Sequence, residues 1–214
     1  RKSYLYIKFK ELLTEKLTIS GLNKKKISLL DRDFFQDKFI VFNGENKNEF
    51  FYDSVIYLCE HNQDGAFGFI VNKPSAISES QLLSKLNLKK PKQLESIFRV
   101  MIGGPVAMDS IYAIHDEELI KDESSLLREG LWLSTSQKVL NKIDIQDTAN
   151  HKIFLGYSGW GPEQLEKEIQ DGAWHVCDVD FELIFNDKPS SIIEELSKKV
   201  GYNIKSIINQ NKVQ

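Results

Sequence analysis

Two short runs pair a thiol with an imidazole at the spacing of neighbouring side chains on one face of a β-strand. Cys59 and His61 stand two positions apart at the end of the run 54–61, Ser-Val-Ile-Tyr-Leu-Cys-Glu-His. Strand alternation places such residues on one face, and a nearby imidazolium can lower the pKa of a thiol until the thiolate forms. A free cysteine in an apolar strand also serves as a small buried residue. We expect that packing role and keep Cys59 with His61 as the catalytic candidates.

His175 and Cys177 repeat the same spacing. If the two strands paired, two cysteines and two histidines could surround a zinc ion. Tight zinc sites usually contain a C-x-x-C spacing, which this chain lacks, as it lacks the Walker and dinucleotide glycine motifs. We therefore expect no metal and no cofactor.

Glycine-rich segments supply the remaining candidates. The segment 156–162, Gly-Tyr-Ser-Gly-Trp-Gly-Pro, is predicted to join a strand to a helix, where exposed amides can hold an anion. The alternative is that its glycines form a tight turn while Trp160 fills the core. A nucleophile elbow needs glycine where Trp160 stands, so hydrolase chemistry at Ser158 is disfavoured. The candidate ligand-binding residues are Asn72, Gly103, Gly104, Ser158, Gly159, Trp160 and Gly161.

The surrounding pattern predicts strands that come in groups, with helices between the groups. Residues 55–61 are apolar on both alternating faces, and a turn at 62–65 leads to a second apolar run at 66–72, which predicts an antiparallel hairpin. Ser78 and Gln81 have the capping-box spacing of a helix start, as do Ser134 and Gln137. Further β-runs are predicted at 174–179 and 181–185, and a last helix ends at Gly201. The sequence predicts one compact α+β domain with a mixed, mainly antiparallel sheet and flanking helices.

Charge divides the 214-residue chain into a basic arm and an acidic body. Residues 1–26 hold eight basic and two acidic residues, so the remainder holds 20 of the 28 basic and 29 of the 31 acidic residues. Residues 1–33 are predicted to form a basic amphipathic helix and linker, and 34–214 the folded domain. Nucleic acid could be bound only through the arm. A helix packed on a second subunit, giving a homodimer, is the alternative use of the arm.

The lengths of the apolar runs, the amino end and the cysteines indicate where the protein resides. Charged or amide residues break each run before about 18 apolar residues accumulate, so no membrane span is predicted. The amino end shows no secretory signal, and two distant cysteines are typical of reduced thiols. We expect a cytoplasmic protein.

Four blocks in order resemble the YqgE/AlgH family of bacterial proteins. They are 54–61 (SVIYLCEH), 65–74 (GAFGFIVNKP), 103–106 (GGPV) and 156–166 (GYSGWGPEQLE), and the resemblance covers about residues 34–201. It implies a compact α+β fold, a label of transcriptional regulator and no settled enzymatic activity. Lys73 stands where the family usually has arginine, and Cys177 matches no family position.

Together these observations predict a cytoplasmic regulatory or interaction protein that contains no identifiable catalytic motif. The alternative is an enzyme or small-ligand binder whose site lies near Cys59, His61 and the glycine-rich segments.

Overall fold

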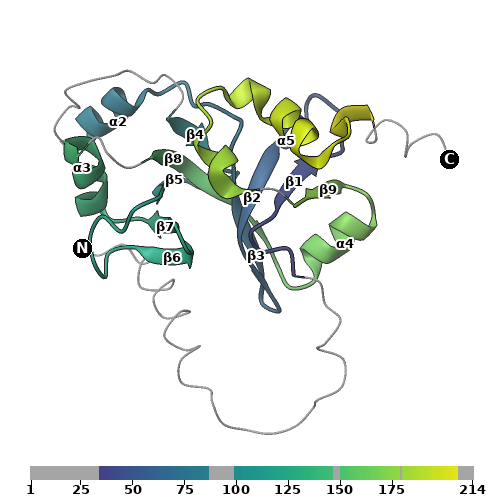
Figure 1. Ribbon diagram of the computed structural model, residues 1–214, viewed down its shortest axis with the longest axis horizontal. Helices are drawn as coiled ribbons and strands as arrows, with labels where there is room; N and C mark the ends of the chain where they lie inside the picture. The colour runs from purple at the N-terminus through teal and green to yellow at the C-terminus, as the bar shows by residue number, and fades with distance from the viewer. Residues whose placement is uncertain (1–33, 87–98, 147–149, 179, 207–214) are drawn as a thin grey trace, which may run out of the picture. The chain divides into compact units, whose positions relative to one another are not determined.

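A curled sheet of nine strands forms the centre of the protein (Figure 1). The computed structural model describes residues 34–86, 99–146, 150–178 and 180–206. The predicted arm lies outside them and stays a prediction. The strands are β1 (Phe39–Phe42), β2 (Val55–Asn62), β3 (Gly65–Ile70), β4 (Val100–Ile102), β5 (Val106–His115), β6 (Ser125–Arg128), β7 (Leu131–Ser134), β8 (His151–Trp160) and β9 (Trp174–Cys177). The helices are α2 (Glu79–Lys85), α3 (Gln137–Gln146), α4 (Gln164–Gln170), the 3-10 turns η1 (Phe181–Phe185) and η2 (Pro189–Ser191), and α5 (Ile192–Val200).

The strand order confirms the predicted α+β class. The sheet runs β6-β7-β5-β8-β3-β2-β1-β9, and β4 pairs with β8 off this path. The β4–β8 pair is parallel and the others are antiparallel, so the sheet is mixed but mainly antiparallel. β8 carries β4 and β5 along its first half and β3 along its second half.

The predicted hairpin is confirmed. β2 and β3 pair antiparallel, with Asn62 opposite Gly65 at the turn. The Asn62 side chain accepts the Asp64 amide at 2.8 Å, and Gly65 takes a φ of 128° that other residues rarely adopt. Because residues 55–59 are all buried, β2 is covered on both faces as its composition predicts.

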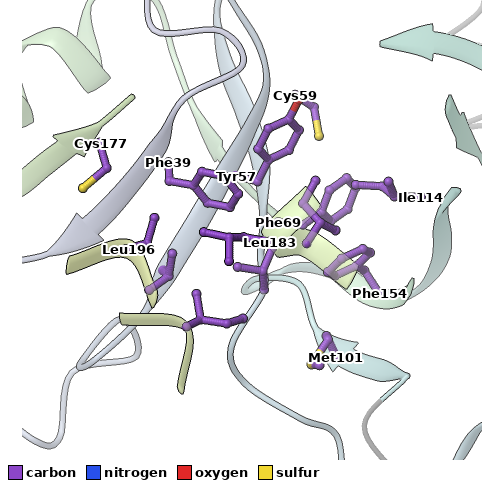
Figure 2. Close-up of a cluster of buried hydrophobic side chains, with 14 of the residues drawn as sticks. Phe39, Tyr57, Cys59, Phe69, Met101, Ile114, Phe154, Cys177, Leu183 and Leu196 are labelled. Carbon is purple, nitrogen blue, oxygen red and sulfur yellow. The ribbon is translucent and has the colours of Figure 1, made fainter. Parts of the chain in front are cut away.

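Three apolar clusters stabilise the two faces of the sheet. The largest, around Tyr57 and Phe69, lies between one face and the side chains of η1 and α5 (Figure 2). On the opposite face, Ile56 belongs to a cluster with Leu165 of α4. A third cluster places Ile153 of β8 against α2 and α3, which Figure 1 shows at the other end of the sheet from α4 and α5. Burial of these apolar side chains is the main favourable contribution to folding.

Local sequence patterns predicted two helix ends correctly and were wrong at two other places. Ser78 forms a capping box with Gln81, and Gly201 ends α5 in the left-handed conformation, both as predicted. The prediction that Ser134 caps a helix is wrong, because Ser134 ends strand β7 and its hydroxyl contacts His115. Residues 181–185 form a 3-10 turn rather than a strand, with Leu183 and Ile184 buried under the sheet.

Candidate functional site

The thiol of Cys59 is sealed in the core. Its side chain lies in the cluster with Tyr57 and is 3% exposed. Burial, followed by the nearby charges of Asp37 and Glu60, raises its pKa well above the usual value. A buried thiol with a raised pKa stays protonated at neutral pH, so Cys59 has the character of a packing residue.

The predicted single face for Cys59 and His61 is wrong. β2 has a bulge between Leu58 and Glu60, and one extra residue shifts the alternation of the strand. Cys59 faces the cluster that contains α5, whereas His61 stands opposite Ala66, a member of the cluster on the α4 side. The imidazole therefore does not share a face with the thiol.

His61 instead anchors the segment that enters the sheet. Its Nδ1 accepts a hydrogen bond from the Phe35 amide at 2.8 Å, and its ring stacks on the Phe35 ring with centroids 5.5 Å apart. Its Nε2 lies 3.2 Å from Oε1 of Glu166 on α4. The histidine thus ties the start of the domain to α4.

The glycine-rich segments pack backbone against backbone. Residues 156–160 lie inside strand β8, so the prediction of a strand-to-helix loop is wrong for most of this segment. A methyl group on Gly103 or Gly104 would overlap the backbone of β8 between Gly156 and Ser158. The Ser158 hydroxyl is fully buried and donates to the Gly103 carbonyl at 3.1 Å. These residues do come together, and what they form is a close contact between β8 and the segment before β5.

The other predicted ligand residues are engaged in local hydrogen bonds. Trp160 is 7% exposed, and its indole donates to Oε2 of Glu168 at 2.9 Å. The Gly161 amide donates to Gln164, and Gly159 stands opposite Phe67 in the β3–β8 ladder. Asn72 accepts the Val55 amide at 2.8 Å and donates to the Asp53 carbonyl at 2.7 Å. Ligand binding by these residues stays a prediction.

The two thiol–imidazole runs are not neighbours in the sheet. β1 lies between β2 and β9, with Phe39 opposite both Tyr57 and Cys177. Figure 2 shows Cys59 and Cys177 on either side of the Phe39 and Tyr57 rings. Within the described ranges, no group of three or more His, Cys, Asp or Glu side chains is placed to hold a metal.

Three sets of buried polar side chains were missed by the sequence argument. Glu79 Oε1 of α2 lies 2.7 Å from His151 Nε2 of β8. Burial raises the pKa of Glu79, but the hydrogen bond to His151 and the nearby basic groups, which include Arg99 and Lys152, together outweigh burial, so the pKa is lowered. On the other side of β8, Lys152 is 1% exposed, its Nζ donates to the Asn186 carbonyl at 2.9 Å, and burial lowers its pKa to about 8.

A hydrogen-bonded pair of His115 and Ser134 is the third missed set, with Ser134 Oγ and His115 Nε2 2.8 Å apart. Its members are 19 positions apart, and Glu79 and His151 are 72 positions apart. No local spacing could have shown either pair. The alignment of β5 with β8, which puts His115 opposite His151, brings both groups to one end of the sheet.

Two surface hollows lie apart from the predicted site. One of about 420 Å³ is lined by α2 and the segment before it, and one of about 620 Å³ by α5 and the residues that follow it. Neither contains any of the predicted residues. None of the helices in the described part of the chain is long and apolar enough to cross a membrane.

The domain is a curled-sheet α+β protein, and known proteins share its fold. The model of the AlgH-like family, DUF179, matches residues 39–205, and the chain belongs to this family. A UPF0301 protein of Shewanella loihica is 32% identical over 180 residues, 83% of this chain and 97% of the relative. Another, of Shewanella denitrificans, is 34% identical over 162 residues, 75% of this chain and 88% of the relative.

Solved structures agree with the architecture. The solution structure of the AlgH protein from Pseudomonas aeruginosa matches with a TM-score of 0.66 and 28% identity, over 87% of this chain and 96% of that one. A crystal structure of a Corynebacterium diphtheriae protein matches with a TM-score of 0.59 and 18% identity, over 77% of this chain and 88% of that one, which shows the fold alone.

Proposed function

We propose that this AlgH-like protein is a cytoplasmic regulatory protein that acts by binding a protein partner rather than by chemistry at Cys59 and His61. The observation that carries the proposal is a bulge in β5. Val106 stands opposite Tyr157 and Ile111 opposite Leu155, so residues 107–110 lie opposite Gly156 alone. This bulge holds Ala107 at a φ of 48°. A strained, bulged strand is a feature that concentrates at functional surfaces.

The bulge also exposes apolar side chains. Val106 is 39% exposed and Met108 49% exposed, beside the half-buried ring of Tyr157. Exposed apolar groups gathered on one strand, rather than scattered singly, are typical of protein-binding surfaces. Flexible methionine side chains adapt to partner surfaces.

Replacing Val106 and Met108 together with serine is expected to abolish partner capture while changing the free energy of unfolding by less than about 0.5 kcal/mol, because both side chains are exposed. Capture from a bacterial lysate on the immobilised full chain, followed by quantitative mass spectrometry, measures this. The matched control is Leu126→Ser, at a residue that is 62% exposed on the edge strand β6. A partner set shared equally by all three proteins would contradict the proposal.

The basic arm supports a second candidate function, binding to nucleic acid, because it separates eight basic residues from an otherwise acidic chain. We expect duplex DNA affinity to fall steeply with salt and to vanish when residues 1–26 are deleted. Fluorescence anisotropy at two salt concentrations measures this. The variant with Lys24, Lys25 and Lys26 replaced by glutamate keeps the length of the arm and should also lose binding. Undiminished binding by the shortened chain would contradict this candidate.

Sedimentation of the same proteins tests the proposed homodimer through the arm.

A further inference from the structure

The sulfur-containing side chains of the protein differ widely in their access to solvent. The sequence contains two cysteines and two methionines, and all of them lie within the described residues. Met101 is 0% exposed, Cys177 1% and Cys59 3%, and all three belong to the largest apolar cluster. Met108 is 49% exposed. A dissolved oxidant that attacks sulfur therefore meets one accessible side chain, that of Met108.

The two thiols are poor competitors for such an oxidant. The thiolate is the form of cysteine that peroxides attack, and exposure decides how fast they reach it. Burial raises the pKa of Cys59 well above its usual value and raises the pKa of Cys177 to about 12, so both thiols stay protonated at neutral pH. A thioether has no proton to lose, and its oxidation needs only access. Peroxide should therefore be directed to Met108.

The bulge of β5 leaves the Met108 side chain outside the core. Residues 107–110 lie opposite Gly156 alone, so they depart from the regular alternation of the strand. Gly156 has a φ of 69°, and a methyl group on it would lie 3.1 Å from Met108 Cα. The absence of a side chain at Gly156 thus lets the backbone of the bulge lie close to β8. Because Met108 is held there by its backbone, we expect a change in its exposed side chain to leave the fold intact.

We propose that Met108 is a redox modification site, at which hydrogen peroxide converts the thioether to the sulfoxide and thereby releases the protein partner from the surface that contains Val106 and Met108. This role of Met108 rests on the binding function proposed above. A sulfur lone pair forms a bond to one peroxide oxygen, the O–O bond breaks, and the leaving hydroxide takes up the remaining proton as water. The sulfur is oxidised, and the peroxide is reduced by the same electron pair. The sulfoxide oxygen is polar, so burying it against an apolar partner surface costs free energy.

Peptide mapping of the full chain after treatment with hydrogen peroxide tests the modification. We expect Met108 to be oxidised at least about tenfold faster than Met101, because a buried methionine reacts only when the protein opens. In concentrated urea the two rates should become equal, which would show that the fold causes the difference. Equal rates in the folded protein, or oxidation of Cys59 or Cys177 before Met108, would overturn the inference.

Partner capture by the untreated and the oxidised chain tests the consequence. The immobilised full chain is treated with peroxide, and the peroxide is removed before lysate is added. We expect oxidation to lower capture by about tenfold. Treatment with a dithiol and the methionine sulfoxide reductases for both sulfoxide epimers should restore capture. Met108→Leu has no thioether at this position, so its capture, whatever its level, should not change on treatment with peroxide.

The outcomes of the capture experiment distinguish the modification from the binding function. If the untreated chain captures no partner that is lost when Val106 and Met108 are replaced with serine, the binding function fails and the modification fails with it. If such a partner is captured equally by the oxidised chain, or if Met108→Leu loses it on treatment with peroxide, only the modification fails. The circular dichroism spectrum of the oxidised chain should match that of the untreated chain. An unfolded oxidised chain would also overturn the inference, because release would then follow from unfolding.

Discussion

Replacing Lys152 with methionine is expected to stabilise the protein at pH 7 by about 1 to 2 kcal/mol. Lys152 is 1% exposed, and burial lowers its pKa to about 8 from the usual 10.5. Each unit of such a shift corresponds to about 1.4 kcal/mol, so keeping the ammonium charged in the folded protein costs about 3 kcal/mol. Methionine removes that cost and has a similar volume. It leaves the Asn186 carbonyl without its lysine donor, however, and this lost hydrogen bond destabilises the variant by about 1 kcal/mol.

The same change should alter the pH dependence of stability. Between pH 8 and 10.5 the unfolded chain binds more protons at this position than the folded chain does. The contribution of Lys152 to the free energy of unfolding of the wild type therefore rises with pH. The methionine variant lacks this rise. The difference in the free energy of unfolding between the two proteins should therefore shrink from pH 7 to pH 9.5. Urea denaturation at both pH values measures it.

Lys198→Met is the control for removing a lysine charge as such. Lys198 is 61% exposed and pairs with Glu194 and Glu195 on the surface of α5. An exposed pair contributes less than about 1 kcal/mol, so this variant should show little change at either pH. A Lys152→Met protein that is less stable than the wild type at pH 7 would show that the charge of Lys152 is compensated by its surroundings.

Replacing Gly104 with alanine is expected to destabilise the protein by about 3 kcal/mol or more. The added methyl group would overlap the Tyr157 carbonyl and the Ser158 amide nitrogen, which are backbone atoms of β8. They can move only if the ladder between β8 and its neighbours is disturbed, and β8 pairs with β3, β4 and β5. For a domain of this size the melting temperature should fall by roughly 10 °C.

Gly161→Ala provides the comparison in the same region. Its added methyl group would meet nothing closer than Gln164 Oε1 at 3.9 Å. Differential scanning calorimetry of both variants separates the steric effect from the general effect of replacing glycine, which is below about 1 kcal/mol. Equal melting temperatures for Gly104→Ala and Gly161→Ala would contradict the packing role assigned to the glycine-rich segment.

Local patterns predicted the elements whose structure is decided locally. The turn at 62–65 and the apolar faces of 55–61 predicted the β2–β3 hairpin, and the capping box at Ser78 predicted the start of α2. The same argument failed at 181–185, where β-forming residues make a 3-10 turn against the sheet. There, burial against a distant part of the chain overrides local propensity.

The candidate site was harder to predict because one inserted residue changes it. The bulge after Leu58 moves His61 to the other face from Cys59, and a bulge has no reliable signature in an apolar run. The pairs Glu79–His151 and His115–Ser134 depend on which strands neighbour each other, which composition does not reveal. Motif spacing drew attention to the glycines, but it could not distinguish a ligand-binding loop from close contact between backbones.

The place of β8 in the chain has a consequence for biosynthesis. A nascent chain that has emerged only to residue 150 contains β1 to β7, but β8, which pairs with β4 and β5 along its first half and with β3 along its second half, has not yet appeared. Until β8 is synthesised, the strands that pair with it have unpaired edges, and unpaired edges promote pairing with other chains. Interrupted synthesis in this interval should yield aggregation-prone fragments, so co-translational protection by a chaperone matters most for this stretch of the message.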